Sequence, residues 1–266
     1  MPQLDRIVPL VDAFASQRER IASRVLGLVG ADLAGFDGWY SDALVAEVAS
    51  EVAGQVLAGQ AGTANLTDAY LARVVTLATD KATSPAGVAA GLSRSLRIGQ
   101  PDLAVVYERL GGEFRARRAE GLTRAGALEA TTRRASVMAD TDLSLAFRRQ
   151  VVDFNKRRGV ERYRRVIRSE KPCGLCLAAS DRLYRKANLL PLHGRCRCGV
   201  MPVTFTSDPG STLSNDDLPA LYEVAGGTSA AKLKRVTVEQ HGELGPVLTV
   251  KGQRFRGPAD VYADAA

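Results

Sequence analysis

Apolar side chains recur every three to four positions over most of residues 1–158, a spacing that predicts amphipathic α-helices. The first such stripe covers residues 4–26, where Pro9 marks either a kink or a late start of the helix. A break at residues 35–38 separates this stripe from a second one over residues 44–56. We therefore expect an N-terminal part built from helices.

Glycines and proline suggest where these helices end and begin. Gly59 and Gly62 are expected to close the second helix, and Asn65 or Thr67 is expected to cap a third. Pro101 is well placed to open a further helix, because proline suits the first helical turn. The N-terminal part is thus predicted to consist of several helices of moderate length.

A longer helix is predicted from Leu122 to about Arg158. This stretch contains no proline and a single glycine, Gly126, and Gly159 follows as a natural C-terminal stop. Many arginines lie between its apolar positions, so the helix should be basic and amphipathic. The apolar stripe is predicted at Leu128, Ala135, Met138, Leu145 and Val152.

Beyond Gly159 the pattern changes from helical spacing to short strand-like runs. Residues 163–167 suit a short strand, and a hairpin is expected from residues 235–239 and 247–251, around Gly242 and Gly245-Pro246. The fold class is therefore predicted as mainly α with a small α+β C-terminal module.

Three domains are expected on this reading. Residues 1–120 form a helical N-terminal domain, residues 121–205 contain the long basic helix and a cysteine-bearing module, and residues 206–266 form a loop and the hairpin.

Composition places the chain among globular proteins, with 45% hydrophobic and 24% charged residues. No window approaches the roughly 18 consecutive apolar residues of a membrane span, and the N-terminus lacks a signal-peptide pattern. We therefore expect a reducing compartment, in which clustered cysteines bind metal more often than they form disulfides.

The net charge of +7 is concentrated in the middle of the chain, between flanking parts that are net acidic. Such a basic block suggests a polyanionic neighbour, such as DNA or an acidic protein surface. The alternative is a solvated helix face that keeps the protein soluble. The candidate polyanion-binding residues are Arg148, Arg149, Lys156, Arg157, Arg158, Arg162, Arg164 and Arg165.

All four cysteines and one of the two histidines lie within residues 173–198. Cys173 and Cys176 form a C-x2-C turn, and His193 and Cys196 repeat that spacing, which is typical of zinc knuckles. The spacing therefore favours Cys173, Cys176, His193 and Cys196 as zinc ligands, with Cys198 as the substitute.

The predicted zinc is structural rather than catalytic. Five potential ligands compete for four places, whereas a catalytic zinc keeps an open position and a nearby carboxylate, and the nearest acid here is Asp181. A redox C-x2-C or a chance cluster of thiols are the alternatives. The redox reading would need a thioredoxin-like strand–helix context, which the flanking sequence does not supply.

Several of these motifs together resemble a known family. The strand Tyr-Arg-Arg-Val-Ile-Arg at residues 163–168, the C-x2-C, and Leu-Pro-Leu-His-Gly-Arg-Cys-Arg-Cys at residues 190–198 followed by Pro202 resemble the MuF-like minor head proteins of tailed bacteriophages. The resemblance covers roughly residues 120–203, with a weaker likeness at residues 235–260. The Cys-Gly-Leu-Cys form of the first motif and the later His-Gly-Glu-Leu-Gly-Pro at residues 241–246 look like relatives from phages of actinobacteria.

This resemblance implies a head-morphogenesis protein that assists capsid assembly, DNA packaging or DNA ejection and catalyses no reaction. It implies a location inside the phage head, reached from the host cytoplasm during assembly. The implied partners are the portal protein and the capsid or scaffold proteins, with possible nonspecific contact to packaged DNA.

Two other functions remain open at this point. A capsid maturation protease would need a nucleophile, a base and an orienting acid, and His241 is the only histidine left if His193 binds metal. Neither a Gly-x-Ser-x-Gly elbow nor a His-Glu-x-x-His helix occurs. A DNA-binding protein would contact phosphates without sequence preference and with a steep salt dependence, because the arginines spread along a long helix.

Overall fold

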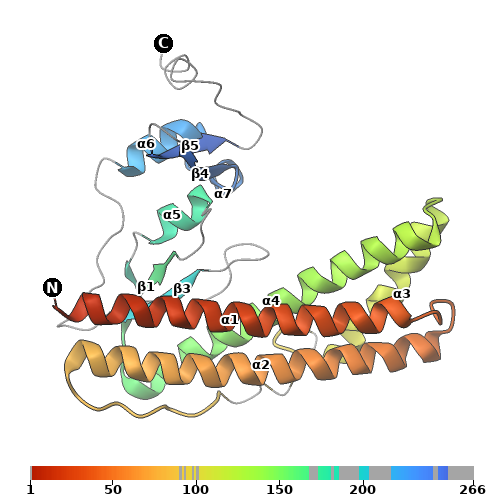
Figure 1. Ribbon diagram of the computed structural model, residues 1–266, viewed down its shortest axis with the longest axis horizontal. Helices are drawn as coiled ribbons and strands as arrows, with labels where there is room; N and C mark the ends of the chain where they lie inside the picture. Colours follow the sequence, from red (N-terminus) through yellow and green to blue (C-terminus); the bar gives the residue numbers. More distant parts are fainter. Residues whose placement is uncertain are drawn as a thin grey trace.

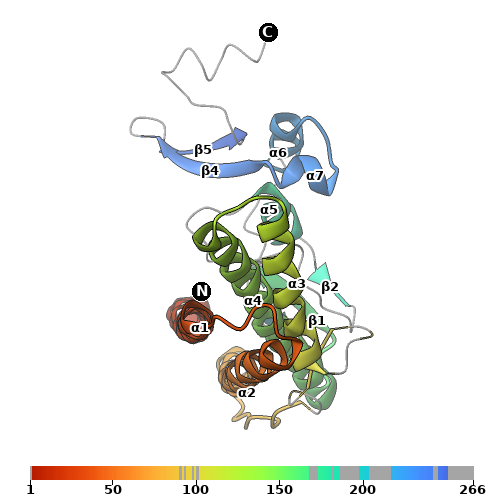
Figure 2. The ribbon, with the colours of Figure 1, turned by 90° about the vertical axis from the view of Figure 1, so that its right-hand side faces the viewer.

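Four long helices form the body of the molecule, two of them side by side and the other two at an angle to that pair, and a small sheet and a cluster of short elements lie on one side of it (Figures 1 and 2). The computed structural model describes residues 2–89, 92, 94–97, 99, 102–167, 173–180, 183–185, 198–203, 217–241 and 245–250. The long helices are α1 (Pro2–Gly35), α2 (Asp42–Thr79), α3 (Leu103–Ala119) and α4 (Arg124–Arg158).

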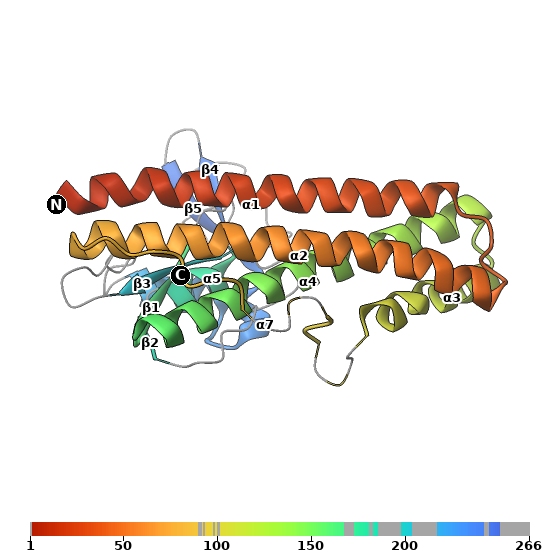
Figure 3. The ribbon, with the colours of Figure 1, turned by 90° about the horizontal axis from the view of Figure 1, so that it is seen from below.

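The two N-terminal helices run side by side over their whole length (Figure 3). α1 begins before Pro9, so the prediction of a late start is wrong. Pro9 lies inside the helix, where it removes one backbone hydrogen bond, and the burial of Ile7 and Val11 around it offsets that cost. α2 is capped by the Ser41 side chain, which accepts from the Leu44 amide, and it ends at Asp80 in a left-handed conformation.

The expected break of α2 at Gly59 and Gly62 is wrong, because the helix continues through both. A Cβ atom at Gly59 would lie 2.6 Å from Val25 Cγ2 and 2.9 Å from Leu143 Cδ2. Glycine is therefore required where α1, α2 and α4 approach closely, and tertiary packing outweighs its low helix propensity.

The helices α3 and α4 match their predictions closely. The side chain of Asp102 caps α3, accepting from the Ala104 amide at 2.9 Å, and Pro101 lies outside the described residues. α4 begins after its cap Thr123 and ends at Gly159, which has a φ of 64°. Such a positive φ favours glycine, so the stop signal in the sequence has the expected physical basis.

The buried stripe of α4 differs from the predicted one. Ala135 is buried, but Leu128 and Met138 are only partly buried. The buried face of α4 consists instead mainly of small residues, which let the neighbouring helices approach closely. The residues on this buried face include Ala127, Thr131, Ala135, Ala139, Leu143 and Ala146.

Two large apolar clusters hold the four helices together. At one end the ring of Trp39 stacks on Phe114, with ring centroids 4.6 Å apart, in a cluster that draws on all four helices. At the other end Phe14 stacks on Tyr70 at 4.1 Å. Because α4 contributes to both clusters, residues 2–158 pack as one helical body, and packing does not separate the parts before and after residue 120.

A three-stranded antiparallel sheet packs on this body. Its strands are β1 (Arg162–Val166), β2 (Leu183–Tyr184) and β3 (Gly199–Val203), in the order β2-β1-β3. The Tyr70 hydroxyl donates to the Val200 carbonyl at 3.2 Å, and Tyr163 joins the same cluster as Phe14. The strand predicted over residues 163–167 is therefore confirmed to within a residue.

The remaining elements form the C-terminal module, on the side of the molecule away from α2 (Figures 1 and 2). They are α5 (Gly174–Ser180), α6 (Asp217–Ala225), α7 (Ala230–Leu233), β4 (Val236–His241) and β5 (Gly245–Val250). The predicted hairpin is confirmed as the β4–β5 pair, although Gly245 and Pro246 lie in the second strand instead of the turn. A mainly helical fold with a small α+β module is thus confirmed. None of the described helices is long and apolar enough to cross a membrane.

Candidate metal centre at the cysteine junction

The C-x2-C motif lies at the start of α5, between the sheet and the C-terminal module. The Cys173 carbonyl accepts from the amides of Cys176 and Leu177, at 2.9 and 3.1 Å, which folds the motif into a tight turn. Cys173 also forms an isolated β-bridge with Thr237 of β4. A Cβ atom at Gly174 would lie 2.9 Å from the Leu233 carbonyl oxygen, so the module packs directly against this turn.

The turn brings two thiols together. The Sγ atoms of Cys173 and Cys176 are 3.5 Å apart, and the Cys173 thiol donates a hydrogen bond to Cys176. A disulfide would require about 2.05 Å. Two thiolates at about 2.3 Å from a tetrahedral zinc would lie about 3.8 Å apart. The observed separation is therefore close to that of two zinc ligands.

A third cysteine lies next to this pair. Cys198, directly before β3, is 4% exposed and packs with Cys176, which is 7% exposed, while Ile167 and Cys173 adjoin them. Three of the five predicted ligands thus gather where the sheet, α5 and β4 meet. The predicted ligands His193 and Cys196 lie outside the described residues, so the choice between Cys196 and Cys198 stays open.

Within the described residues, these cysteines do not by themselves complete a metal site. Over these residues, no group of three or more His, Cys, Asp or Glu side chains has an arrangement that could hold a metal ion. The geometry supplies two thiols at zinc-like spacing with a third cysteine in the same apolar cluster. A complete tetrahedron would draw its remaining ligands from the chain between β2 and β3.

One residue predicted to bind polyanions instead supports the cysteine junction from the helical body. Arg148 of α4 is 1% exposed, and its Nη2 donates to the Cys198 carbonyl at 2.6 Å. Its guanidinium also lies over the Phe147 ring, 4.5 Å from the centroid. A buried guanidinium cannot meet an external polyanion, so Arg148 positions Cys198 and does not form part of a surface patch.

Arg165 differs from its prediction for the same reason. It lies on β1, is 6% exposed, and places its guanidinium 5.4 Å from the centroid of the Tyr184 ring. Sequence reasoning counted the charges of Arg148 and Arg165 but had no signal for their burial. Arg162 and Arg164, which alternate with Arg165 along β1, are half-buried.

Four of the polyanion-binding candidates on α4 are exposed, but they differ in their contacts. Arg149 and Lys156 are exposed on the helix surface. Arg157 and Arg158 are exposed as well, yet both donate hydrogen bonds to backbone carbonyls of the segment that follows α2. Part of the basic block therefore holds the segment that follows α2 against α4.

Two stacked tyrosines connect the sheet to α5. The rings of Tyr163 and Tyr184 are 5.2 Å apart and nearly parallel, and the Tyr184 hydroxyl donates to the Ala179 carbonyl at 2.9 Å. Burial raises the pKa of the Tyr163 hydroxyl, and Tyr184 raises it further, while the charges of Arg165 and Arg148 lower it. The phenol thus remains neutral, which suits a packing role.

A buried carboxylate, which the sequence did not reveal, lies within the helical body. Both carboxylate oxygens of Asp142 are bonded, one to Arg97 Nε at 2.6 Å and the other to the Tyr107 hydroxyl at 2.9 Å. Burial raises the pKa of the Asp142 carboxyl and Arg97 lowers it, and burial raises the pKa of Tyr107. Because both of its oxygens accept hydrogen bonds within the body, this carboxylate connects α3 to α4.

His241, the residue on which a protease would depend, ends β4 and pairs with Gly245 across the hairpin. This position agrees with the predicted strand-to-turn junction. The surroundings of its side chain lie outside the described residues.

Comparison with known proteins adds nothing to this geometry. The chain matches no family model, and searches of curated proteins and of solved structures give no match.

Proposed function

We propose that this chain is a minor head protein of a tailed bacteriophage, associated with the portal vertex inside the capsid. Its C-terminal module would be held on a helical body by a structural zinc. The observation that carries this proposal is the gathering of Cys173, Cys176 and Cys198 at the junction of body and module. Cys173, Cys176 and Cys198, the described cysteines of the MuF-like sequence pattern, are the residues that gather there.

Zinc has a physical purpose at this position. The core of the C-terminal module consists of a small apolar cluster around Leu221, Leu233 and Val236. Units of about 40 residues usually need a metal, a disulfide or a partner to fold. A zinc bound by residues on either side of α5 would supply folding free energy directly to this module.

The helical body supports a role in assembly more than one in catalysis. Its buried charges, such as Asp142, are bonded within the fold, and its apolar residues fill two continuous clusters. Exposed cations such as Arg149 and Lys156 suit a neighbour that carries phosphates. These features fit a scaffold that contacts the portal and packaged DNA.

Location in the virion tests the proposal. The phage that encodes the chain should contain a few copies per particle by quantitative mass spectrometry, and the chain should co-purify with the portal protein encoded in the same genome. Particles from a phage with a stop codon in this gene should show a defect in assembly, packaging or ejection. A chain absent from purified virions and from portal complexes would refute the proposal.

Metal analysis tests the zinc separately. The purified chain should contain about one zinc atom per molecule by elemental analysis, because one tetrahedral site uses the available ligands. A folded module without metal would overturn the zinc part and leave the head location untouched.

A further inference from the structure

The chain that leaves α2 does not cross directly to α3, but first runs back along the helical body (Figure 1). We call residues 82–89 the strap. It has no regular secondary structure, and its polar backbone groups bond mainly to side chains of α2 and α4. Its first half, residues 82–85, and its second half, residues 86–89, are held in different ways.

The second half of the strap is held by buried side chains. Asp68 of α2, 4% exposed, accepts from the amides of Ala86 and Gly87 at 3.0 and 2.7 Å. Gln150 of α4, fully buried, accepts from the Ala89 amide at 2.7 Å and donates to the Gly87 carbonyl at 2.9 Å. No solute can reach these anchors while the helices stay packed.

Exposed arginines hold the first half of the strap and the carbonyl of Ala86, the residue that follows it. Arg157 Nη1 donates to the Ala86 carbonyl at 2.7 Å. Arg158 Nη2 donates to the carbonyls of Ser84 and Pro85, at 2.5 and 2.9 Å. Both guanidiniums are accessible to solvent, and their partners on the strap are neutral carbonyl groups, while Arg157 also pairs with the Asp153 carboxylate on α4.

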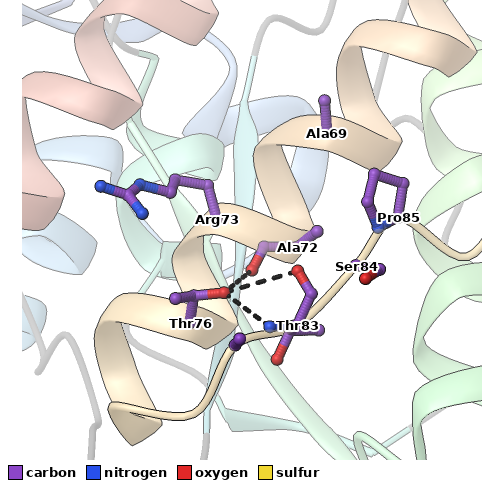
Figure 4. Close-up of a pocket in the computed structure, with 8 residues that line it drawn as sticks. Ala69, Ala72, Arg73, Thr76, Thr83, Ser84 and Pro85 are labelled. Atoms are coloured by element: carbon purple, nitrogen blue, oxygen red, sulfur yellow. Dashed lines mark hydrogen bonds between the residues drawn. The ribbon is translucent and has the colours of Figure 1, made fainter.

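Solvent also reaches the inner side of this half. A shallow hollow of about 370 Å³ lies between α2 and the strap, lined by Arg73, Thr76 and residues 82–85 (Figure 4). The Thr83 amide donates to Thr76 Oγ1 at 3.0 Å across this hollow. Residues 82–85 therefore have open space beside them, whereas Ala89 is buried.

We propose that residues 82–85 are a latch that the phosphates of double-stranded DNA open by competing for Arg157 and Arg158. A guanidinium can form two parallel hydrogen bonds to a phosphate, and the opposite charges attract each other in addition, whereas a backbone carbonyl carries no net charge. A phosphate that binds Arg157 and Arg158 therefore deprives the strap carbonyls of their hydrogen-bond donors. The buried anchors at Asp68 and Gln150 keep the second half of the strap in place.

Charge and shape favour a phosphate backbone over an acidic protein. Exposed Lys81 and Lys156 add positive charge at this end of the body, and Asp153 is paired with Arg157 Nε at 2.7 Å. The planar guanidinium matches the paired oxygens of a phosphate, and two adjacent arginines can span neighbouring phosphates. The choice of DNA as the polyanion rests on the proposed function.

The coupling is reciprocal. If DNA binds the open latch more tightly than the closed one, removal of the latch contacts strengthens DNA binding by the same factor. DNA binding would then loosen the end of the link between α2 and α3 without unfolding the core.

Amide hydrogen exchange on the full chain tests the proposal, with a short random-sequence duplex at low salt as the probe. Exchange at the Thr83 amide should rise about tenfold when the duplex binds, the scale of a typical coupling between sites. The amides of Ala86, Gly87 and Ala89 should keep their protection, because buried side chains hold them. This contrast within eight residues is an internal control.

Two double variants that remove equal charge separate the latch from simple electrostatics. In Arg157→Gln/Arg158→Gln, the Thr83 amide should exchange fast without DNA and respond no further to the duplex. In Arg149→Gln/Lys156→Gln, DNA binding should weaken while the protection of Thr83 and its response remain. Neither Arg149 nor Lys156 contacts the strap.

Three results would overturn the proposal. The first is that the duplex binds but leaves exchange at the Thr83 amide unchanged or slower. The second is that the duplex does not bind at low salt. The third is that polyglutamate increases exchange at the Thr83 amide where the duplex does not. None of these results depends on whether the chain is found in virions, so this proposal and the proposed function can fail separately.

Discussion

The helical body and the C-terminal module show two different ways of holding a fold together. The body buries large side chains, including Trp39, Phe114 and Phe147, in clusters that run between all its helices. Among its described residues, the module has a small apolar cluster with four buried members, and it joins the body through a turn of cysteines and a buried arginine. Large apolar clusters hold the first region together, and the second adds specific polar contacts and, on our proposal, a zinc at the cysteine turn.

Loss of a zinc ligand should give the largest difference between the two regions. Cys173→Ser should abolish zinc binding and the cooperative unfolding of the module, because structural zinc supplies about 10 kcal/mol or more to a small fold. The helical body should keep its circular dichroism and its thermal transition. Limited proteolysis should cut the variant after residue 167 and spare residues 2–158.

The same measurement on Cys198→Ser and Cys196→Ser would identify the fourth ligand. The true ligand should behave like Cys173, and the other cysteine should leave zinc content unchanged. If all three variants kept their zinc and a folded module, the comparison of the two regions would be wrong.

The polar link between the regions should come next in effect. Arg148→Met removes a buried charged hydrogen bond to the Cys198 carbonyl, which should cost about 3 kcal/mol of unfolding free energy. Arg149→Met is the matched control, because the neighbouring side chain is exposed and removal of the same charge should change little. Equal effects in denaturant titrations would show that charge, not burial, matters here.

Packing within the body should respond to a single added methyl group. Gly59→Ala places a Cβ atom within 3 Å of Val25 and Leu143, so the free energy of unfolding should fall by about 2 kcal/mol. Gly54→Ala, in the same helix with open space around it, should instead raise stability by roughly 0.5–1 kcal/mol. Thermal unfolding followed at 222 nm would reveal the opposite signs, and two stabilised variants would contradict this packing.

The smallest effect should come from a surface ion pair on the body. Arg117 donates to Glu113 at 2.7 Å, and Arg134 donates to its other oxygen. The hydrogen bond from Arg117 lowers the pKa of the Glu113 carboxyl from 4.5, burial raises it, and Arg134 lowers it further. Because the pKa falls on folding, the stabilisation is present above pH 4.5 and is lost as the pH falls below it.

Glu113→Gln should therefore lower the melting temperature by about 1–2 °C at pH 7, since solvent weakens exposed pairs. In more acidic buffers the wild type and the variant should converge. A difference that grew as the pH fell would reverse the assigned direction of the pKa.

Elements with strong local signals could be predicted from the sequence. Periodicity, the cap at Thr123 and the glycine stop at Gly159 define α4 without any tertiary information. The hairpin of β4 and β5 follows likewise from two short apolar runs. In each case the residues that set the structure lie within a few positions of one another.

Features that depend on distant partners could not be predicted. Gly59 indicates a helix end in the sequence, and only its contacts with α1 and α4 explain why the helix continues. Arg148 and Arg165 have the same local character as exposed arginines, and their burial is decided by the sheet. The spacing of Cys173 and Cys176 predicted their approach correctly, because a four-residue turn is local.

The contact between Tyr70 and Val200 has a consequence for the order in which the chain folds. The two residues are 130 positions apart. A ribosome adding roughly 5–20 residues per second needs about 7 to 26 s to make that stretch. The helices of the body form much faster, so the apolar surface around Tyr70 is exposed to the cell for seconds before β3 can cover it. During synthesis this surface is where a chaperone would bind and where aggregation would begin.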